Sequence, residues 1–178
     1  METTTVFNKA RSADQVVIRP LTADDSSALL AAFEHLSPET RRLRFMSAGA
    51  RLTMRDAERL TDLDHRQAEA LAAIAPETGE IIGVARYFGL LRDPGAAEVA
   101  VTVDDDWQGQ GIGRRLVTEL AERAHANGFE RLVAFVDQAN QRVTEWLERR
   151  GASRSGGDEL DSMYTLDIAA PTTLRRAA

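Results

Sequence analysis

The spacing of apolar residues in the first third of the chain is that of amphipathic helices, with apolar side chains recurring every three or four positions. A short strand over 16–19 comes before them, and Pro20 ends it. The helices that this pattern predicts cover roughly 23–36, 38–46 and 53–63. A residue type that caps helix N-termini precedes or opens each one: Thr22, Ser37 and Thr53.

From about residue 70 the pattern changes to short runs of small and β-branched residues, which are typical of strands. The expected strands cover 70–75, 81–88, 98–103, 132–136 and 160–168, with turns over 76–79 and 92–95. Helical spacing returns from Ile112 to the stop signal Asn127-Gly128, and again over 140–150. We therefore predict a mixed α+β fold with a largely antiparallel sheet and flanking helices.

A chain of 178 residues fits one domain. We place that domain at 16–168, with flexible tails over 1–15 and 169–178, because both ends are polar and aperiodic.

Composition narrows the possible functions. The absence of cysteine excludes disulfides, thiolate metal sites and a cysteine nucleophile, and three scattered histidines offer little to a metal ion, so we expect no metal. The net charge of −6 without a basic block argues against nucleic-acid binding. No apolar run approaches the length of a membrane span and the N-terminus has no apolar core, so we expect a cytoplasmic protein without membrane contact.

The segment Gln108–Arg114 stands between a strong strand and an amphipathic helix, and its glycines allow a ligand close to the backbone. Free N–H groups at a helix start attract negative charge, above all phosphates. A P-loop is excluded because Lys9 is the only lysine, and the dinucleotide motif fails because Arg114 replaces its third glycine. The pattern that remains is Q-x-x-G-x-G.

This pattern, after a strand and before a helix, resembles the acyl-CoA pyrophosphate loop of the GNAT superfamily of N-acetyltransferases. The block from Asn140 to Gly151-Ala152 is similar to the family's N-x-x-A-x-x-L-Y-x-K-x-G-F motif, whose Asn touches CoA. The resemblance covers roughly 16–168 and implies a GNAT fold and acetyl-CoA as cosubstrate. It implies these cofactor-binding residues: Val101, Thr102, Val103, Gln108, Gly109, Gln110, Gly111, Ile112, Gly113, Arg114 and Asn140.

A narrower resemblance links the N-terminal half to bacterial protein lysine acetyltransferases of the Pat type. Ile18-Arg19-Pro20, Leu36-Ser37-Pro38-Glu39 and Arg44-Phe45 look like their I-R-P, L-S-P-E-x-R and R-F signatures. The resemblance implies a protein lysine as acceptor, with a partner such as an acyl-CoA synthetase. We expect a monomer or a homodimer.

Acetyl transfer to an amine needs a base, because a lysine with a pKa near 10.4 is mostly protonated at neutral pH. Glu98 is our candidate: it opens the strand before the loop and resembles the catalytic glutamate of Pat-type enzymes in A-E-[IV]-A-x-T-V. A backbone N–H where the Val101–Val103 strand leaves its neighbour would hold the oxyanion. The family's usual Tyr acid is replaced by Leu147, so Tyr164 or water would protonate the thiolate.

Two other functions remain open at this point. The same chemistry could act on a small amine, such as a polyamine, amino acid or drug, or the chain could be a non-catalytic acyl-CoA sensor. We interpret Asp104–Asp106 as a solvated bulge and Arg41, Arg42 and Arg44 as an exposed helix face, although these arginines could also contact the 3′-phosphate or an acidic substrate.

Overall fold

The computed structural model describes residues 13–47, 49–158 and 160–168. Its helices are α1 (Ser26–His35), α2 (Pro38–Phe45), α3 (Met54–Thr61), α4 (Ile112–Ala126) and α5 (Gln141–Glu148). Its strands are β1 (Val17–Pro20), β2 (Ala68–Ile74), β3 (Ile81–Leu90), β4 (Asp93–Val103), β5 (Arg131–Asp137), β6 (Ser153–Gly157) and β7 (Asp161–Asp167). Short 3₁₀ turns occur at Ala13–Gln15, Ala23–Asp25 and Asp105–Trp107.

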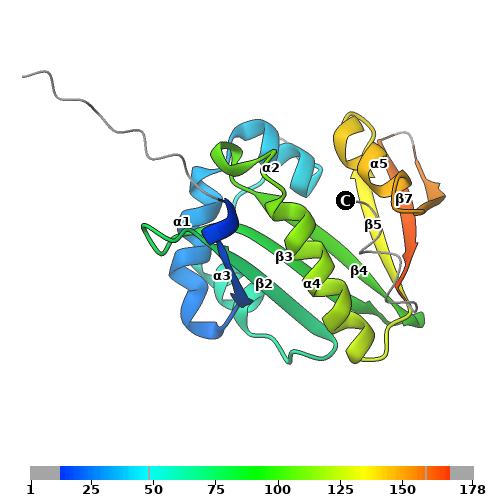
Figure 1. Ribbon diagram of the computed structural model, residues 1–178, viewed down its shortest axis with the longest axis horizontal. Coiled ribbons are helices and arrows are strands. Elements are labelled where there is room, and N and C mark those ends of the chain that lie inside the picture. The colour runs from blue at the N-terminus through cyan, green and yellow to red at the C-terminus, as the bar shows by residue number, and fades with distance from the viewer. Residues whose placement is uncertain (1–12, 48, 159, 169–178) are drawn as a thin grey trace, which may run out of the picture.

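The strands of the described chain form one seven-stranded sheet in the order β1-β2-β3-β4-β5-β7-β6 (Figure 1). Every neighbouring pair is antiparallel except β4 and β5, which run parallel. The chain crosses from β4 to β5 through α4, as a parallel connection requires. The prediction of a largely antiparallel sheet with flanking helices in a mixed α+β fold is confirmed.

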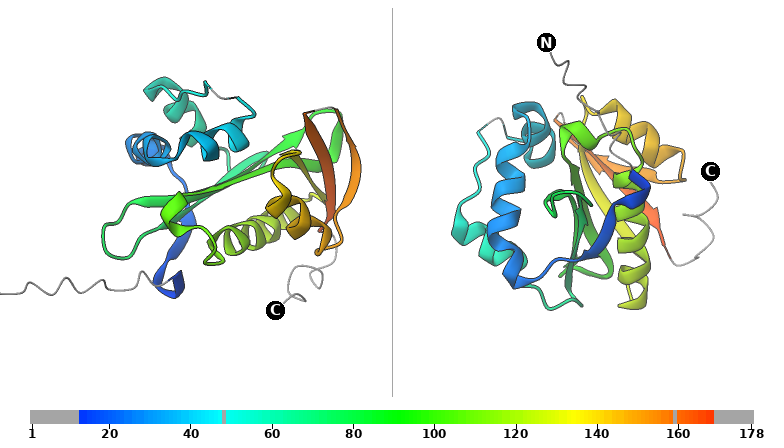
Figure 2. Two further views of the ribbon diagram at one scale, coloured as in Figure 1. Left: turned by 90° about the horizontal axis from the view of Figure 1, so that it is seen from above. Right: turned by 60° about the vertical axis from the view of Figure 1, so that its left-hand side comes forward.

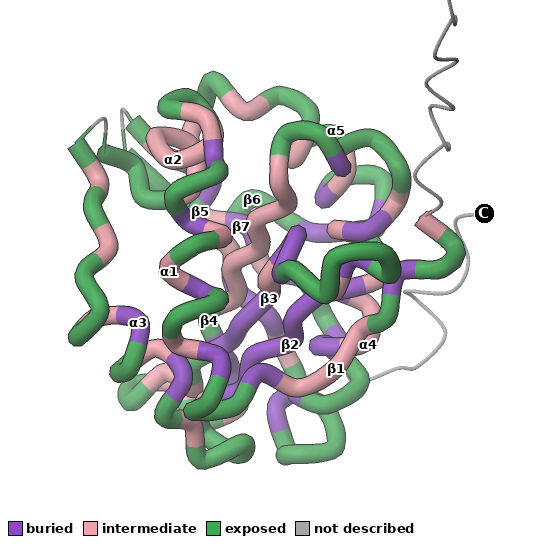
Figure 3. Tube along the Cα trace, turned by 90° about the vertical axis from the view of Figure 1, so that its left-hand side faces the viewer, coloured by how far each residue is buried: buried purple, intermediate pink, exposed green. Residues whose placement is uncertain are grey.

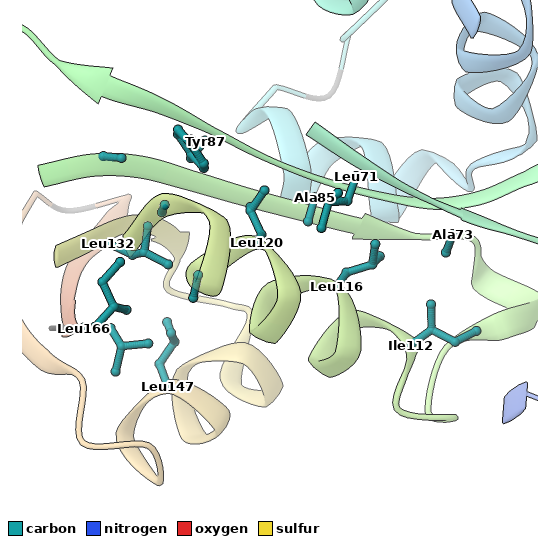
Figure 4. Close-up of a cluster of buried hydrophobic side chains, with 14 of the residues drawn as sticks. Leu71, Ala73, Ala85, Tyr87, Ile112, Leu116, Leu120, Leu132, Leu147 and Leu166 are labelled. Atoms are coloured by element: carbon teal, nitrogen blue, oxygen red, sulfur yellow. The ribbon is translucent and has the colours of Figure 1, made fainter. Parts of the chain in front are cut away.

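Helices cover both faces of the sheet, with α1, α2 and α3 on one face and α4 and α5 on the other (Figure 2). The central strands β2 and β3 are therefore mostly buried (Figure 3). This double cover explains why residues 70–74 of β2 form a continuous apolar run and not an alternating one. On the second face Leu116 and Leu120 of α4 pack against Leu71 and Ala85 of the sheet (Figure 4).

Local capping chemistry sets most helix ends where the sequence predicts them. The Ser37 hydroxyl accepts the Thr40 N–H at 3.1 Å, and Thr53 and Asp56 form a reciprocal capping box at the start of α3. At the other end of α4, Gly128 has φ 93°, and the chain leaves the helix there as predicted.

Three local predictions need correction. The helix expected from residue 23 begins as the 3₁₀ turn Ala23–Asp25, because the Asp25 carboxylate turns back to accept the Thr22 N–H and hydroxyl. The turn predicted over 92–95 is shorter, since β4 already starts at Asp93. Strand β6 was not predicted, because its sequence is polar and glycine-containing and pairs with β7 through an exposed, irregular ladder.

The predicted tails fall mainly outside the described residues. The part that is described, Ala13–Gln15, forms one 3₁₀ turn, and Arg115 of α4 donates hydrogen bonds to the carbonyls of Ala13 and Val16. Within the described segments, none of the helices combines the length and the apolarity that crossing a bilayer demands.

Candidate active site

The two parallel strands at the centre of the sheet separate after a short paired stretch. Ala96–Glu98 of β4 pair with Arg131–Val133 of β5, and the described strands show no further pairing between these two. On its other edge β4 stays paired with β3 as far as Val103. The sheet therefore opens into a cleft between β4 and β5, and Glu98 lies where it begins.

Backbone alternation shows which main-chain groups face this cleft. The Asp104 N–H donates to the Ile82 carbonyl, so even-numbered residues at this end of β4 turn their main-chain groups toward β3. The main-chain groups of Val101 and Val103 then point into the cleft, as does the Val99 carbonyl. The Val103 carbonyl accepts from the Gln108 side-chain amide at 3.1 Å. Because Glu98 still pairs with Val133, the Val99 N–H belongs to the last step of the ladder, and the first cleft-facing N–H beyond it is that of Val101, in the predicted Val101–Val103 segment.

The cleft holds a cavity of about 500 Å³, within the range of small-molecule sites. The residues predicted to act on or bind acetyl-CoA converge on its wall. Those that line it are Glu98, Val101, Thr102, Val103, Gln108, Gly109, Gly111, Ile112, Gly113, Arg114 and Asn140. Gln110 is the exception: its side chain donates to the Asp106 carbonyl, and it lies outside the lining.

Glycine shapes the loop between β4 and α4. Gly109 and Gly111 have φ of 79° and 82°, a region that side chains with a Cβ rarely adopt. Gly111 is the N-cap of α4, and a Cβ placed there would meet nothing within 4 Å, so the helix start faces open space. At Gly113 a Cβ would lie 3.5 Å from Val103 Cγ2, because α4 packs closely on β4. The start of α4 thus presents N–H groups and a positive dipole end to the cleft.

Comparison with known proteins places this geometry in a family. The sequence model of the acetyltransferase (GNAT) family matches residues 30–152. The chain belongs to the GNAT family of acetyltransferases. This makes it an acyltransferase, as the glycine loop beside a splayed sheet indicates.

Individual relatives agree with that membership. Acetyltransferase PA5475 of Pseudomonas aeruginosa is 33% identical over 132 residues, which cover 73% of this chain and 70% of that protein. Acetyltransferase Pat of Mycolicibacterium smegmatis is 30% identical over 144 residues, 81% of this chain but 43% of Pat. The chain thus spans less than half the length of Pat. The GNAT domain of S. lividans PAT superposes with a TM-score of 0.79 at 28% identity, covering 85% of this chain and 90% of that one.

Positive charge gathers at the loop end of the cleft of this GNAT acetyltransferase. Arg114, Arg142 and Arg149 all line the cavity, and the Arg142 guanidinium lies 3.6 Å from where a Cβ on Gly109 would be. Nearby Arg150 is buried over the Trp146 ring, and burial lowers its pKa, helped by the charges of Arg114 and Arg149. Sequence reasoning found Arg114 but missed Arg142, which α5 brings to the loop, and Arg149, which follows α5 and bonds to Glu145 at 3.4 Å.

The base candidate sits among charges of the opposite sign. Glu98 is exposed and shares the cavity wall with Arg44 of α2. Burial lowers the pKa of Arg44, and the charge of Glu98 opposes that change. Arg86, buried on β3, has its pKa lowered to about 10 by burial and then by the like charge of Arg44, and it donates to the Leu60 carbonyl.

Leu147, which stands where many GNAT enzymes have a tyrosine acid, is part of the core. Leu147 is buried in one cluster with Leu132 and Leu166 (Figure 4), and all three also line the cavity. Tyr164 of β7 also lines the cavity, but its hydroxyl lies 3.4 Å from Glu148 Oε1 and donates toward that carboxylate.

Two surface interpretations change with the structure. Asp105 is not merely part of a solvated bulge, because its carboxylate accepts three hydrogen bonds from Ser37 and Thr40 at the start of α2. Arg42 is not simply exposed, because it bonds to Asp137 at 2.6 Å. In the part of the chain that the structure describes, no three His, Asp or Glu side chains come together in a way that could hold a metal ion.

Proposed function

We propose that this enzyme transfers the acetyl group of acetyl-CoA directly to the ε-amino group of a protein lysine. The observation that carries the proposal is the position of Glu98 at the point where β4 and β5 separate, in one cavity with the glycine loop at its other end. A carboxylate there lies beside the place where a thioester would stand if its diphosphate rested on the loop.

The cavity suits coenzyme A in shape and charge. The N–H groups at the start of α4 and the guanidinium groups of Arg114, Arg142 and Arg149 are the donors that phosphates need. The cleft-facing N–H and carbonyl of Val101 can pair with an amide-bearing chain, as an added strand would. The fit supports acetyl-CoA as the cosubstrate.

The chain's own residues supply two parts of the reaction. Deprotonating a lysine at pH 7 costs about 4.6 kcal/mol, and a general base raises the rate by about 10²–10⁴-fold, which offsets much of that cost. In this reaction Glu98 would be the base that accepts the amine proton. The Val101 N–H, the first beyond the ladder, would donate to the oxygen that becomes negative. The amine nitrogen forms a bond to the acetyl carbon, the carbon–sulfur bond breaks, and the sulfur leaves with the electron pair and takes up a proton.

The surface around Glu98 favours a macromolecular acceptor. Met46 and Phe135 line the same cavity as Glu98, and Phe88 lies opposite Glu98 on β3; all three are among the exposed large apolar side chains. Apolar walls suit the four methylenes of a lysine, whose charged end alone prefers water. Exposed aromatic side chains around a site are also typical of protein contacts.

The decisive experiment replaces Glu98 by Gln. We expect acetyl-CoA affinity to stay within a few-fold and turnover at pH 7 to fall about 100-fold, because the base is lost and the shape is kept. CoA thiol release with lysine peptides measures turnover, and calorimetry measures affinity. Glu58→Gln on α3, outside the cavity lining, is the matched control and should keep full turnover. Unchanged turnover of Glu98→Gln would remove Glu98 from the mechanism.

One observation favours a second candidate, a small amino-acid acceptor. Arg44 stands on the same wall as Glu98, where its guanidinium could pair with the carboxylate of an amino acid. A panel of lysine peptides, polyamines and free amino acids separates the two acceptor classes. Tight acetyl-CoA binding with no thiol release for any acceptor would instead support a sensor. Mass spectrometry of lysines acetylated in a lysate of the host then identifies protein targets.

A further inference from the structure

Helix α2 joins the two strands that separate at the cleft. On the β4 side the anchor is Asp105, two residues beyond the end of the strand. Its Oδ2 accepts the Ser37 N–H at 2.9 Å, and its Oδ1 accepts the hydroxyls of Ser37 and Thr40 at 2.8 and 2.7 Å. One carboxylate thus fixes the first turn of α2.

On the β5 side the anchor is Asp137, the last residue of that strand. Arg42 Nη1 donates to Asp137 Oδ2 at 2.6 Å, while the other Asp137 oxygen accepts the Ala139 N–H at 2.8 Å. The Asp137 side chain is 15% exposed, so this pair is better shielded from water than an ordinary surface ion pair. Arg42 also bonds to Glu39 within α2, which holds its guanidinium in place.

Other side chains of α2, beside these anchoring contacts, face the cavity. Thr40, Leu43 and Arg44 line it, and so does Met46 just beyond the helix. Gln108 of the glycine loop donates to both Thr40 Oγ1 and the Val103 carbonyl, at 3.3 and 3.1 Å. The loop that would hold the diphosphate, the strand beside the thioester and the wall on the acceptor side are therefore linked.

We propose that Asp105, Arg42 and Asp137 are positioning residues that hold α2 across the cleft and so set its width. This inference rests on the proposed acetyl transfer for its catalytic consequence. The physical reason is that ladder hydrogen bonds fix the distance between β4 and β5 only as far as Glu98. Beyond that point α2 connects the two strand ends, through the Asp105 carboxylate on the β4 side and the Asp137 carboxylate on the β5 side. We call this connection the tie.

The strand spacing matters to the reaction in two ways. A displacement of about 1 Å between reacting groups can cost about 10²-fold in rate. A wider cleft also admits water, which attacks the thioester carbon in place of the amine: a carbon–oxygen bond forms, the carbon–sulfur bond breaks, and acetate and CoA thiol are released. Loss of the tie should therefore lower transfer, raise the share of hydrolysis and speed the departure of CoA.

The test uses Arg42→Gln, Asp137→Asn, their double variant and Asp105→Asn in the full chain. The dissociation rate of CoA is followed by tryptophan fluorescence, because both tryptophans of the chain, Trp107 and Trp146, line the cavity. We expect each variant to release CoA about tenfold faster, a change of about 1.4 kcal/mol. The ratio of acetyl-CoA hydrolysis to acceptor acetylation should rise several-fold. The double variant should match the single variants, because Arg42 and Asp137 act through one bond.

The matched control is Arg131→Gln. Arg131 bonds to Asp93 at 2.8 Å and also ties β5 to β4, but at the end where these strands already pair. It should leave both the CoA dissociation rate and the hydrolysis ratio unchanged. Arg42→Lys, which keeps one donor for Asp137, should restore most of the wild-type behaviour.

The outcomes separate this inference from the proposed function. If wild-type protein binds CoA but acetylates no acceptor, the proposed function fails, while the dissociation rates still test the tie. The inference is overturned if Arg42→Gln and Asp137→Asn release CoA at the wild-type rate and keep the wild-type ratio of hydrolysis to acetylation. A fall in thermal stability with the ratio unchanged would also overturn it, because α2 would then be only structural.

Discussion

At the scale of single residues, protonation of the leaving CoA sulfur is the reaction step for which the chain offers the fewest candidate donor groups. Leu147 occupies the position of the family's tyrosine and is buried in the core. The hydroxyl of Tyr164 is already directed at Glu148. A thiol with a pKa of about 8.5 leaves readily without an acid, so protonation by water suffices.

We therefore predict that Tyr164→Phe keeps kcat within about threefold of wild type. The hydroxyl that is removed donates to Glu148 and not into the cavity, so the reaction loses no proton donor. Steady-state kinetics between pH 6 and 9 provide the measurement, and Tyr87→Phe, which removes a buried hydroxyl outside the cavity lining, controls for general destabilisation. A 100-fold loss in Tyr164→Phe alone would identify it as the general acid.

At the scale of elements, the junction between β4 and α4 carries the proposed binding of acetyl-CoA. Its residues are consecutive in the chain, so the sequence pattern locates it without knowledge of distant contacts. Gly111 caps α4 in a left-handed conformation, which turns the chain so that the helix start faces open space. We infer that the same element serves both as the helix cap and as the proposed anion site.

Gly111→Ala separates these two roles. A Cβ in this conformation costs about 1 kcal/mol of folding stability even where space is open, and the strained loop should weaken acetyl-CoA binding at least fivefold. Gly151→Ala is a matched control, because Gly151 follows α5 with φ 80° and also has open space around its Cβ position. Denaturant titration should show similar destabilisation of both variants, and calorimetry should show weaker binding only for Gly111→Ala. Equal affinities would contradict the assignment of the loop.

At the scale of the whole molecule, the distribution of charge matters more than its sum. The net charge is −6, yet three arginines converge on the loop end of the cleft. Acidic side chains elsewhere act as structural acceptors, and Asp25 is the clearest case. Both of its oxygens accept from Arg19, at 2.8 and 2.7 Å, and this bond, with those from Thr22, lowers the pKa of Asp25 to about 2.

This pair should contribute to acid stability with a defined sign. Because the folded pKa of Asp25 lies below the unfolded value, its contribution is present above about pH 4 and is lost as the pH falls toward 2. We expect Asp25→Asn to lose about 1–2 kcal/mol at pH 7, and the difference from wild type to shrink below pH 4. Urea unfolding from pH 7 to 3 measures it, with exposed Asp24→Asn as the control. A difference independent of pH would disprove the role of the ion pair.

The sequence alone determined the elements whose signals are local. Periodicity predicted the helices and most strands, Ser37 and Thr53 predicted their caps, and the loop from Gln108 predicted both the anion site and the family. These signals depend on residues within a few positions of one another, so they are readable before folding. Strand β6 lacked such a signal, because neither alternation nor β-branched residues mark it.

Only the tertiary structure decided how the cleft is built. Arg42 meets Asp137 across 95 positions and Ser37 meets Asp105 across 68, and α5 carries Arg142 to the glycine loop. A single arginine or aspartate looks the same in the sequence whether it faces water or a partner. Its role depends on which chain segments the packed sheet brings beside it, and that packing is a property of the whole fold.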